Sequence, residues 1–170
     1  MIEEKFLLDS NSFMTPYQNY YPFDLAPGFW KQMKPKLACH SVAVLDVVKD
    51  EILKGNDELT VWLEEIHDLN VIDKRDIQIV QKYAQVLKYV QDSPLYTDKA
   101  LRMWSNVSIA DPWLIATASV YGYKIVTFET GAGKISTPSG KPKIPDIARQ
   151  FDVNCVNLFY FMRKMGFQLK

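Results

Sequence analysis

The sequence predicts a single α/β domain, with a short central parallel sheet covered by helices on both faces. Two short apolar runs, Lys5–Leu8 and Lys124–Phe128, have the length of buried strands, and segments of helical periodicity separate them. Strands that alternate with helices form parallel sheets with both faces covered. Because 170 residues are enough for one sizeable core, we expect residues 1–170 to form one domain.

The strands are predicted where apolar runs stop at residues that favour turns. The first run ends at Asp9 and leads into the polar cluster 9–12, and the second ends at Glu129. A weaker strand is expected at 153–156, and the segment 37–44 fits either a strand or a helix.

The helices are predicted from apolar residues that recur every three or four positions and from the residues that flank them. Asp57 is the expected N-cap of one helix, and Gly55 is expected to end the helix before it. Asp111 and Pro112 are expected at the N-cap and the first position of a later helix. The predicted helices span residues 44–52, 59–66, 77–90, 97–104, 111–121, a short segment from 145, and 158–164.

Two segments do not fit an idealised alternation of strands and helices. The segment 14–30 contains six aromatic residues and three prolines. We expect it to form a packed irregular excursion, because exposing so many rings would favour aggregation, and a stacking platform for nucleobases is the alternative. The segment 130–143, with three glycines, two prolines and three lysines, is predicted to be a mobile loop.

The charge of the chain is balanced but unevenly distributed. The formal net charge is zero, so no general attraction to nucleic acid is predicted, yet residues 122–170 carry eight Lys or Arg and only three Asp or Glu. That bias suits a polyanion contact or an ordinary solvated basic face. No apolar stretch approaches signal-peptide or membrane-spanning length, so a cytoplasmic location is the default expectation. The two cysteines and two histidines lack the spacing of a zinc site.

Four acidic residues lie where separate elements of such a fold would converge. Asp9 and Glu129 each end a predicted strand, and the functional crevice of a parallel sheet lies beyond the carboxyl ends of its strands. Asp111 begins a predicted helix and Glu51 lies on another. We therefore expect these acids to share one site.

Carboxylates that converge in a crevice repel one another unless a cation offsets their charge. Oxygen ligands of this kind favour Mg²⁺ or Mn²⁺, which position phosphates and activate water. Asp46 and Asp50 lie on the same predicted helix as Glu51, and either of them is the alternative to Glu51 as the metal ligand. The pattern predicts a divalent-metal site.

Four segments resemble the PIN-domain nuclease family, and they occur in the family's order over most of the chain. An apolar strand is followed by Asp, a small hydroxyl residue and a polar residue in Phe6–Asn11, and Val47–Ile52 resembles the helical segment with the second acid. Ala110–Ala118 is similar to the helix that starts with the third acid and continues into small residues. Tyr121–Glu129 matches the Gly, strand and Thr-x-acid that follow.

The resemblance implies a PIN-like three-layer α/β/α fold and Mg²⁺- or Mn²⁺-dependent hydrolysis of phosphodiesters, usually in RNA. It also implies a toxin that is held inactive by a cognate antitoxin protein, and family members commonly form homodimers. The aromatic segment after Phe13 has no counterpart in the smallest members, which suggests a divergent branch.

Carried over position by position, the resemblance makes Asp9, Glu51 and Asp111 metal ligands and Glu129 a fourth acid. The fourth acid is usually Asp in the family, so the longer Glu129 is a departure, and Asp146 is a candidate for an additional carboxylate. Residues expected to orient ligands or water are Ser10, Asn11 and Thr127.

Other interpretations remain open at the level of sequence. Lys134, Lys141 and Lys143 are candidates for RNA phosphate contacts or for a solvated loop, and the glycines beside Lys134 do not have phosphate-loop spacing. A catalytically silent RNA- or protein-binding module would keep the same fold. A phosphotransfer enzyme with Asp9 as nucleophile is the third alternative, but such enzymes generally have a second Asp where Asn11 stands.

Overall fold

A five-stranded, entirely parallel sheet forms the centre of the protein, as the sequence predicts. The computed structural model describes residues 3–170; Met1 and Ile2, which the predicted domain 1–170 also includes, lie outside the described residues. The strand order is β3-β2-β1-β4-β5, so the first strand is central. The strands are β1 (Phe6–Leu8), β2 (Val42–Leu45), β3 (Val71–Ile72), β4 (Lys124–Val126) and β5 (Cys155–Val156).

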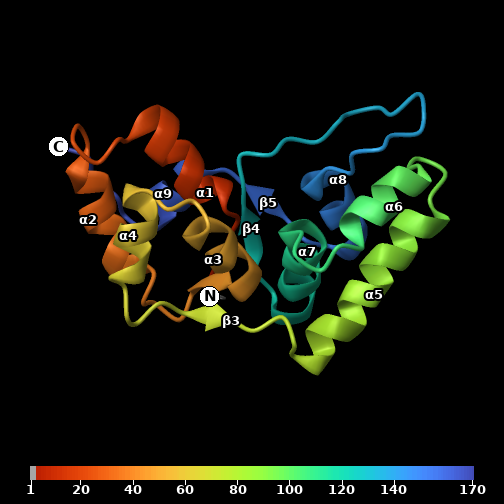
Figure 1. Cartoon of the computed structure of the whole chain (residues 1–170), viewed down its shortest axis with the longest axis horizontal. Helices are drawn as coiled ribbons and strands as arrows, with labels where there is room; N and C mark the ends of the chain where they lie inside the picture. The colour runs from red at the N-terminus through yellow and green to blue at the C-terminus, as the bar shows by residue number, and fades with distance from the viewer. Residues whose placement is uncertain (1–2) are drawn as a thin grey trace.

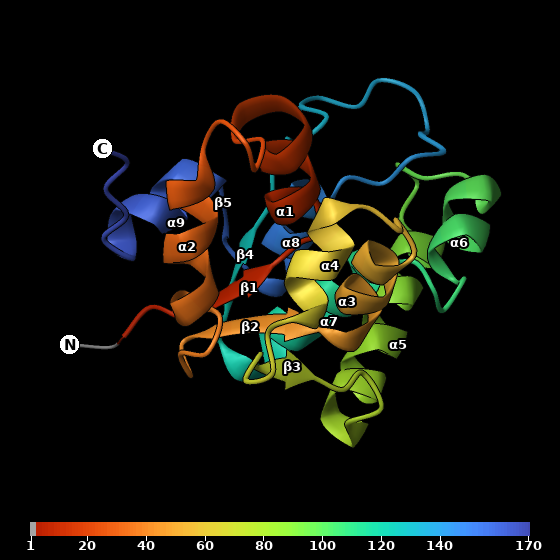
Figure 2. The same cartoon turned by 60° about the vertical axis from the view of Figure 1, so that its left-hand side comes forward.

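Helices cover both faces of this sheet, which gives three layers (Figures 1 and 2). In both views α2 and α9 lie on one side of the strands, and α5, α6 and α7 lie on the other. The helices are α1 (Asn11–Thr15), α2 (Pro27–Lys36), α3 (Asp46–Leu53), α4 (Glu58–Glu64), α5 (Ile77–Asp92), α6 (Asp98–Trp104), α7 (Ala110–Tyr121), α8 (Ile144–Ala148) and α9 (Leu158–Lys164). A π-helical turn, Pro16–Tyr20, continues α1, and a 3₁₀ turn, Arg149–Phe151, continues α8.

The core forms because the central strands are apolar on both faces. All of β1 and β2 is buried, as expected for parallel strands that carry helices above and below. On one face Phe6 of β1 meets Phe161 of α9 edge-on, with ring centroids 5.2 Å apart. On the other face α7 is buried from Pro112 to Ala118, and its Trp113 stacks on Tyr83 of α5. The sheet is thereby fixed from both sides.

The aromatic-rich segment 14–30 is packed as expected, but the expectation that it is irregular was wrong. Much of it is helical, through the end of α1, the π-helical turn and the start of α2. Phe23 stacks on Trp30 with ring centroids 4.5 Å apart, and Tyr21 stacks on Phe29 at 4.6 Å. Pro16 and Pro27 permit this because they stand at the first positions of helical segments, where a backbone N–H has no partner in any case, and Pro22 lies between those segments.

Two predicted helix boundaries differ from the structure. The ambiguous segment 37–44 leads into strand β2, and α3 begins only at Asp46. Helix α7 begins at Ala110, so Asp111 lies in its first turn and not at the N-cap, which is Ile109. Proline marks a helix start only to within the first turn, because none of the first four N–H groups is needed inside the helix.

The glycine-rich segment 130–143 contains no helix, and its far end crosses to the α5–α6 connection. Ser139 accepts a hydrogen bond from the Thr97 N–H at 3.0 Å and donates its own N–H to the Leu95 carbonyl at 2.8 Å. In Figure 1 this segment arcs from the end of β4 past α6 before it returns to α8. Within residues 3–170 no helix is both long and apolar enough to cross a bilayer.

Candidate metal centre

The four predicted acids are supplied by four separate elements. Asp9 directly follows β1, Glu129 follows β4, Asp111 lies in the first turn of α7, and Glu51 lies on α3. Strands β1 and β4 are neighbours in parallel register, and the Asp9 N–H donates to the Val126 carbonyl at 3.0 Å. The carboxyl ends of the two strands therefore place the segments that carry Asp9 and Glu129 side by side.

Asp9 is a buried carboxylate held by two hydrogen bonds. Its side chain is only 5% exposed. The Ser10 N–H donates to Oδ1 and the Thr127 hydroxyl donates to Oδ2, each at 2.8 Å. Burial nevertheless raises the pKa of Asp9 to about 6, with further increases from the charges of Glu129 and Glu51. The two hydrogen bonds fix the orientation of the carboxylate without removing the cost of its charge.

A polar network centred on Thr127 ties the ends of β1 and β4 together. The Thr127 hydroxyl, which donates to Asp9, accepts from the Asn11 side-chain amide at 3.1 Å and from the Glu129 N–H at 3.0 Å. The Asn11 carbonyl in turn accepts from the Phe128 N–H at 3.1 Å. Asn11 and Thr127 thus orient the segments that carry the acids. Ser10 contributes its backbone N–H to the Asp9 carboxylate.

Ser12 belongs to the same network, and sequence reasoning treated it only as part of a turn. It is completely buried, and its hydroxyl donates to the Val126 carbonyl at 2.8 Å. The signal that could have identified it is its position three residues after Asp9, because residues three apart in a helical turn lie on one side. The bond links α1 to the end of β4.

In the described part of the chain, the carboxylate of Asp111 lacks the hydrogen bonds that hold the carboxylates of Asp9 and Glu129. It is half-buried, and its carboxylate has no hydrogen-bond partner among residues 3–170. Burial raises the pKa of Asp111 to about 7, and the charges of Asp9, Glu129 and Glu51 raise it further, while Lys143 lowers it. A partly desolvated carboxyl flanked by three others is the arrangement that a bound cation would stabilise most.

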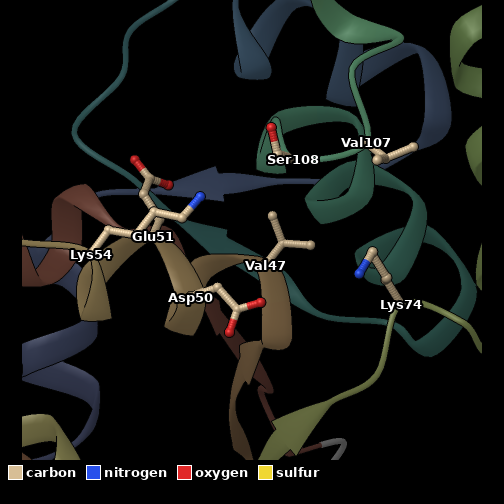
Figure 3. Close-up of a pocket in the computed structure, with 7 residues that line it drawn as sticks. All are labelled: Val47, Asp50, Glu51, Lys54, Lys74, Val107 and Ser108. Carbon is tan, nitrogen blue, oxygen red and sulfur yellow. The ribbon is translucent and has the colours of Figure 1, made fainter.

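Glu51, and not Asp46 or Asp50, is the acid on α3 whose charge acts on both Asp9 and Asp111. Asp46 accepts from the Val47 N–H at 2.8 Å and lies beside Lys74. In Figure 3 the carboxylates of Asp50 and Glu51 point in different directions from the helix. Glu51 lines a small pocket with side chains from α3, the β3–α5 connection and the α6–α7 connection, including Lys54, Lys74, Val107 and Ser108.

Glu129 and Asp146 are both engaged by backbone N–H groups around α8. Glu129 accepts from the Ile144 N–H at 3.0 Å, and its pKa is raised chiefly by burial. Asp146 accepts from the Ala132 N–H at 2.9 Å, and its charge acts on Glu129. Asp146 thus binds the backbone of the glycine-rich segment that follows Glu129.

The three candidate lysines are placed differently. Lys143 directly precedes Ile144, whose N–H binds Glu129, and its charge lowers the pKa of both Asp111 and Glu129. Lys134 and Lys141 are exposed on the segment 130–143, and neither acts on the acids in this way. Only Lys143 is placed to meet a phosphate that approaches the acid cluster.

The four carboxylates are suitable ligands for a hard divalent cation, although their oxygen atoms do not surround one common point. Within residues 3–170, no three His, Cys, Asp or Glu side chains lie close enough together to hold one ion as they stand. Repulsion among the carboxylates and the bond from Ile144 to Glu129 both favour this spacing. Four carboxylates from four elements are nevertheless the oxygen ligands that Mg²⁺ and Mn²⁺ prefer.

Replacing Asp111 with Asn is expected to stabilise the protein in chelator at pH 8. The pKa of Asp111 is about 7 in the fold, against an ordinary value of 3.8, so the folded protein loses stability as pH rises from about 4 to 7. One pKa unit corresponds to about 1.4 kcal/mol, and partial exposure reduces the effect, so we expect a gain on the order of 1–3 kcal/mol. Urea unfolding of both proteins at several pH values measures it.

The gain from Asp111→Asn should shrink as pH falls from about 7 towards 4, because the wild-type carboxyl then takes up a proton in the fold. Asp50→Asn, an exposed neighbour of Glu51, is the matched control and should change stability little at any pH. Equal stability of wild type and Asp111→Asn at pH 8, or a gain that increases on acidification, would contradict the assigned burial of Asp111.

Comparison with known proteins places the chain in a family and independently supports the fold. A chain from the crystal structure of DNA-bound VapBC from Salmonella typhimurium aligns with a TM-score of 0.51 and 14% sequence identity, covering 92% of this chain and 99% of that chain. At that identity the likeness concerns the fold alone. No curated protein matches the sequence significantly. A family model described as a domain of unknown function (DUF4411) matches residues 6–169, nearly the whole chain, and the protein therefore belongs to the DUF4411 family.

Proposed function

We propose that the protein is a Mg²⁺- or Mn²⁺-dependent endoribonuclease that hydrolyses phosphodiester bonds in RNA. The observation that carries the proposal is the electrostatic coupling of Asp9, Glu51, Asp111 and Glu129 at the carboxyl ends of β1 and β4, with the pKa values of Asp9 and Asp111 raised to about 6 and about 7. A protein gains nothing in stability from such a cluster, so a role with a cation is its best explanation.

The side chains that would hold the ion are those of Asp9, Glu51, Asp111 and Glu129. When bound, Mg²⁺ or Mn²⁺ lowers the pKa of an attached water and offsets charge on the phosphate oxygens. The protein's own groups have separate tasks. Thr127 and the Ser10 N–H hold the Asp9 carboxylate in place, and Lys143 supplies positive charge beside the acids for an incoming phosphate.

We further propose that this activity makes the protein the toxin of a toxin–antitoxin pair, controlled by an antitoxin protein in the cytoplasm. The support is the shared fold with a chain from DNA-bound VapBC and the order of the four acidic segments along the sequence. A homodimer, as the family resemblance suggests, is compatible with this role. The antitoxin and the RNA target are separate questions from the chemistry of the acids.

Incubation of the purified protein with a single-stranded RNA tests the chemistry directly. We expect cleavage with Mn²⁺ or Mg²⁺ and none in excess chelator, because the acids alone repel the phosphate backbone. The same ions should raise the melting temperature, since a ligand that binds only the folded state stabilises it. Cleavage that persists unchanged in chelator would contradict the proposal, as would a melting temperature that ignores both ions.

A catalytically silent RNA- or protein-binding module is the second candidate. One specific observation favours it: in the described chain, residues 3–170, no three potential ligands are gathered tightly enough to hold an ion. The incubation above separates the two functions. A silent module would bind RNA without cleaving it under any metal condition, and a nuclease would cleave.

A further inference from the structure

A second recess adjoins the acid cluster, and the proposed metal-binding role of the four acids does not account for the other residues that line it. It has a volume of about 480 Å³ and opens beside the carboxyl ends of β4 and β5. Its lining includes Thr127 and Glu129 together with three aromatic side chains, Tyr20, Phe128 and Phe159. The recess and the acid cluster thus share Glu129 as a common wall.

The three rings come from distant parts of the chain and form a closed triangle. Tyr20, at the end of the π-helical turn, stacks on Phe128 with ring centroids 5.9 Å apart and planes inclined by 28°. Phe159 of α9 meets both rings edge-on, at 6.0 Å from Tyr20 and 6.2 Å from Phe128. Tyr20 remains 50% exposed, so this ring presents much of its surface to solvent.

The polar groups around the rings fit an aromatic heterocycle better than a phosphate. No Lys or Arg is among the residues that line the recess, so the walls offer no charge that would hold a phosphate inside it. Thr130 and Asn157 line it as well, and their side chains can exchange hydrogen bonds with the edge of a base. Positive charge lies nearby but outside, at Lys143 beside Asp111 and Glu129.

A chain of hydrogen bonds also joins the backbone of Phe128 to the acid cluster. Asn11 accepts from the Phe128 N–H and donates to Thr127, and Thr127 donates to Asp9. The backbone that carries the Phe128 ring is therefore held by Asn11, which is bonded in turn to the Thr127 hydroxyl that orients Asp9. A nucleotide that spans the two features would meet them at a fixed separation.

We propose that this recess binds an unpaired nucleobase of the RNA, adjacent to the phosphate that faces the acid cluster. The inference rests on the proposed function, because it takes the acids as the point where a phosphate is held. Base stacking on aromatic side chains requires a base that is free of its partner, so the substrate class is single-stranded RNA. The glycine-rich segment that begins at Thr130 forms one side of the recess.

The proposal is tested by binding of a short single-stranded RNA that carries 2-aminopurine, whose fluorescence is quenched when it stacks. Asp111→Asn protein with Mn²⁺ serves as the background, so that cleavage does not consume the probe. In that background we expect quenching on binding, and Tyr20→Ala should weaken binding roughly 5- to 100-fold, the value of one stacked base, with loss of quenching. Tyr20→Phe should bind within about twofold of the background because it keeps the ring.

Tyr123→Ala is the matched control, because Tyr123 precedes β4 and lies at the opposite end of that strand from Phe128. It should leave binding unchanged. The proposal is overturned if Tyr20→Ala binds and quenches like its parent, if a duplex of the same sequence competes equally well, or if no RNA binds. An apolar side chain of a partner protein as the true occupant would give the last of these results.

Failure of this inference and failure of the proposed nuclease are distinguishable. Wild-type protein that cleaves RNA with Mn²⁺ but binds it independently of Tyr20 would retain the nuclease and remove the base site. Protein that never cleaves RNA, yet binds it with ring-dependent quenching, would retain the base site and remove the nuclease.

Discussion

Asp9→Asn and Asp111→Asn are each expected to lower the rate of Mn²⁺-dependent RNA cleavage by at least about 100-fold. Loss of a group that merely orients a metal ligand already costs about 10- to 100-fold, so loss of a ligand should cost more. Asn offers one neutral oxygen where the carboxylate offers two charged ones. Initial rates on a labelled RNA at saturating Mn²⁺ measure the effect, and the melting temperature with and without Mn²⁺ reports metal binding independently of turnover.

Asp50→Asn is the control for both substitutions. Asp50 is exposed, it is next to Glu51 in sequence, and its carboxylate points away from that of Glu51 in Figure 3. Asp50 lines the same small pocket as Glu51, but its charge is not among those that raise the pKa of Asp9 or Asp111, so the variant should cleave RNA within about twofold of wild type. Equal activity of wild type and both Asn variants would remove the metal site from the mechanism, since Asp9 and Asp111 are its central members.

Thr127→Val is expected to destabilise the protein by about 2–3 kcal/mol and to reduce cleavage about 10- to 100-fold. Valine has nearly the same shape but no hydroxyl. The buried Asp9 carboxylate would lose a donor at 2.8 Å, and the Asn11 amide and the Glu129 N–H would lose their acceptor. Buried polar groups left without partners are costly, which sets the size of the effect. Urea unfolding and cleavage at several Mn²⁺ concentrations check the two parts.

Thr127→Ser keeps the hydroxyl and serves as the matched control for Thr127→Val. It should retain most of the activity and lose only the small contribution of one buried methyl group, about 1 kcal/mol. If Thr127→Val and Thr127→Ser had the same stability and the same cleavage activity, the role of Thr127 would be packing and not hydrogen bonding.

The parts of the fold that the sequence predicts are those with long or sharply bounded patterns. Helix α5 repeats its apolar positions over four turns, and β1 and β4 are short apolar runs that stop at acids. The two-residue strand β3 was not predicted, because Asn70 and Asp73 directly flank its two apolar residues and no longer apolar run marks it. The π-helical turn was missed for a different reason: its one proline, Pro16, suggests a break, yet it begins a helical segment here.

The candidate site also has parts that the sequence predicts and parts that it does not. Asp9, Glu129 and Asp111 stand at the ends of elements, where chain order alone suggests that they meet. The contacts of Ser12 and the triangle of Tyr20 with Phe128 and Phe159 could not be predicted, because they join segments from different parts of the chain. Asp111 was predicted as a site residue at the N-cap, but it lies in the first turn of α7, since a proline fixes a helix start only approximately.

The strand order has a consequence for when activity can arise during synthesis. Strand β1 is made first but lies at the centre of the sheet, and its partner β4 begins only at Lys124. Contacts between residues so far apart in sequence form late and slowly. A chain interrupted before Lys124 lacks the segment that supplies Thr127 and Glu129, so an incomplete translation product cannot form the acid cluster. A cell that makes this protein would meet the complete cluster only after Glu129, and with it more than three-quarters of the chain, had left the ribosome.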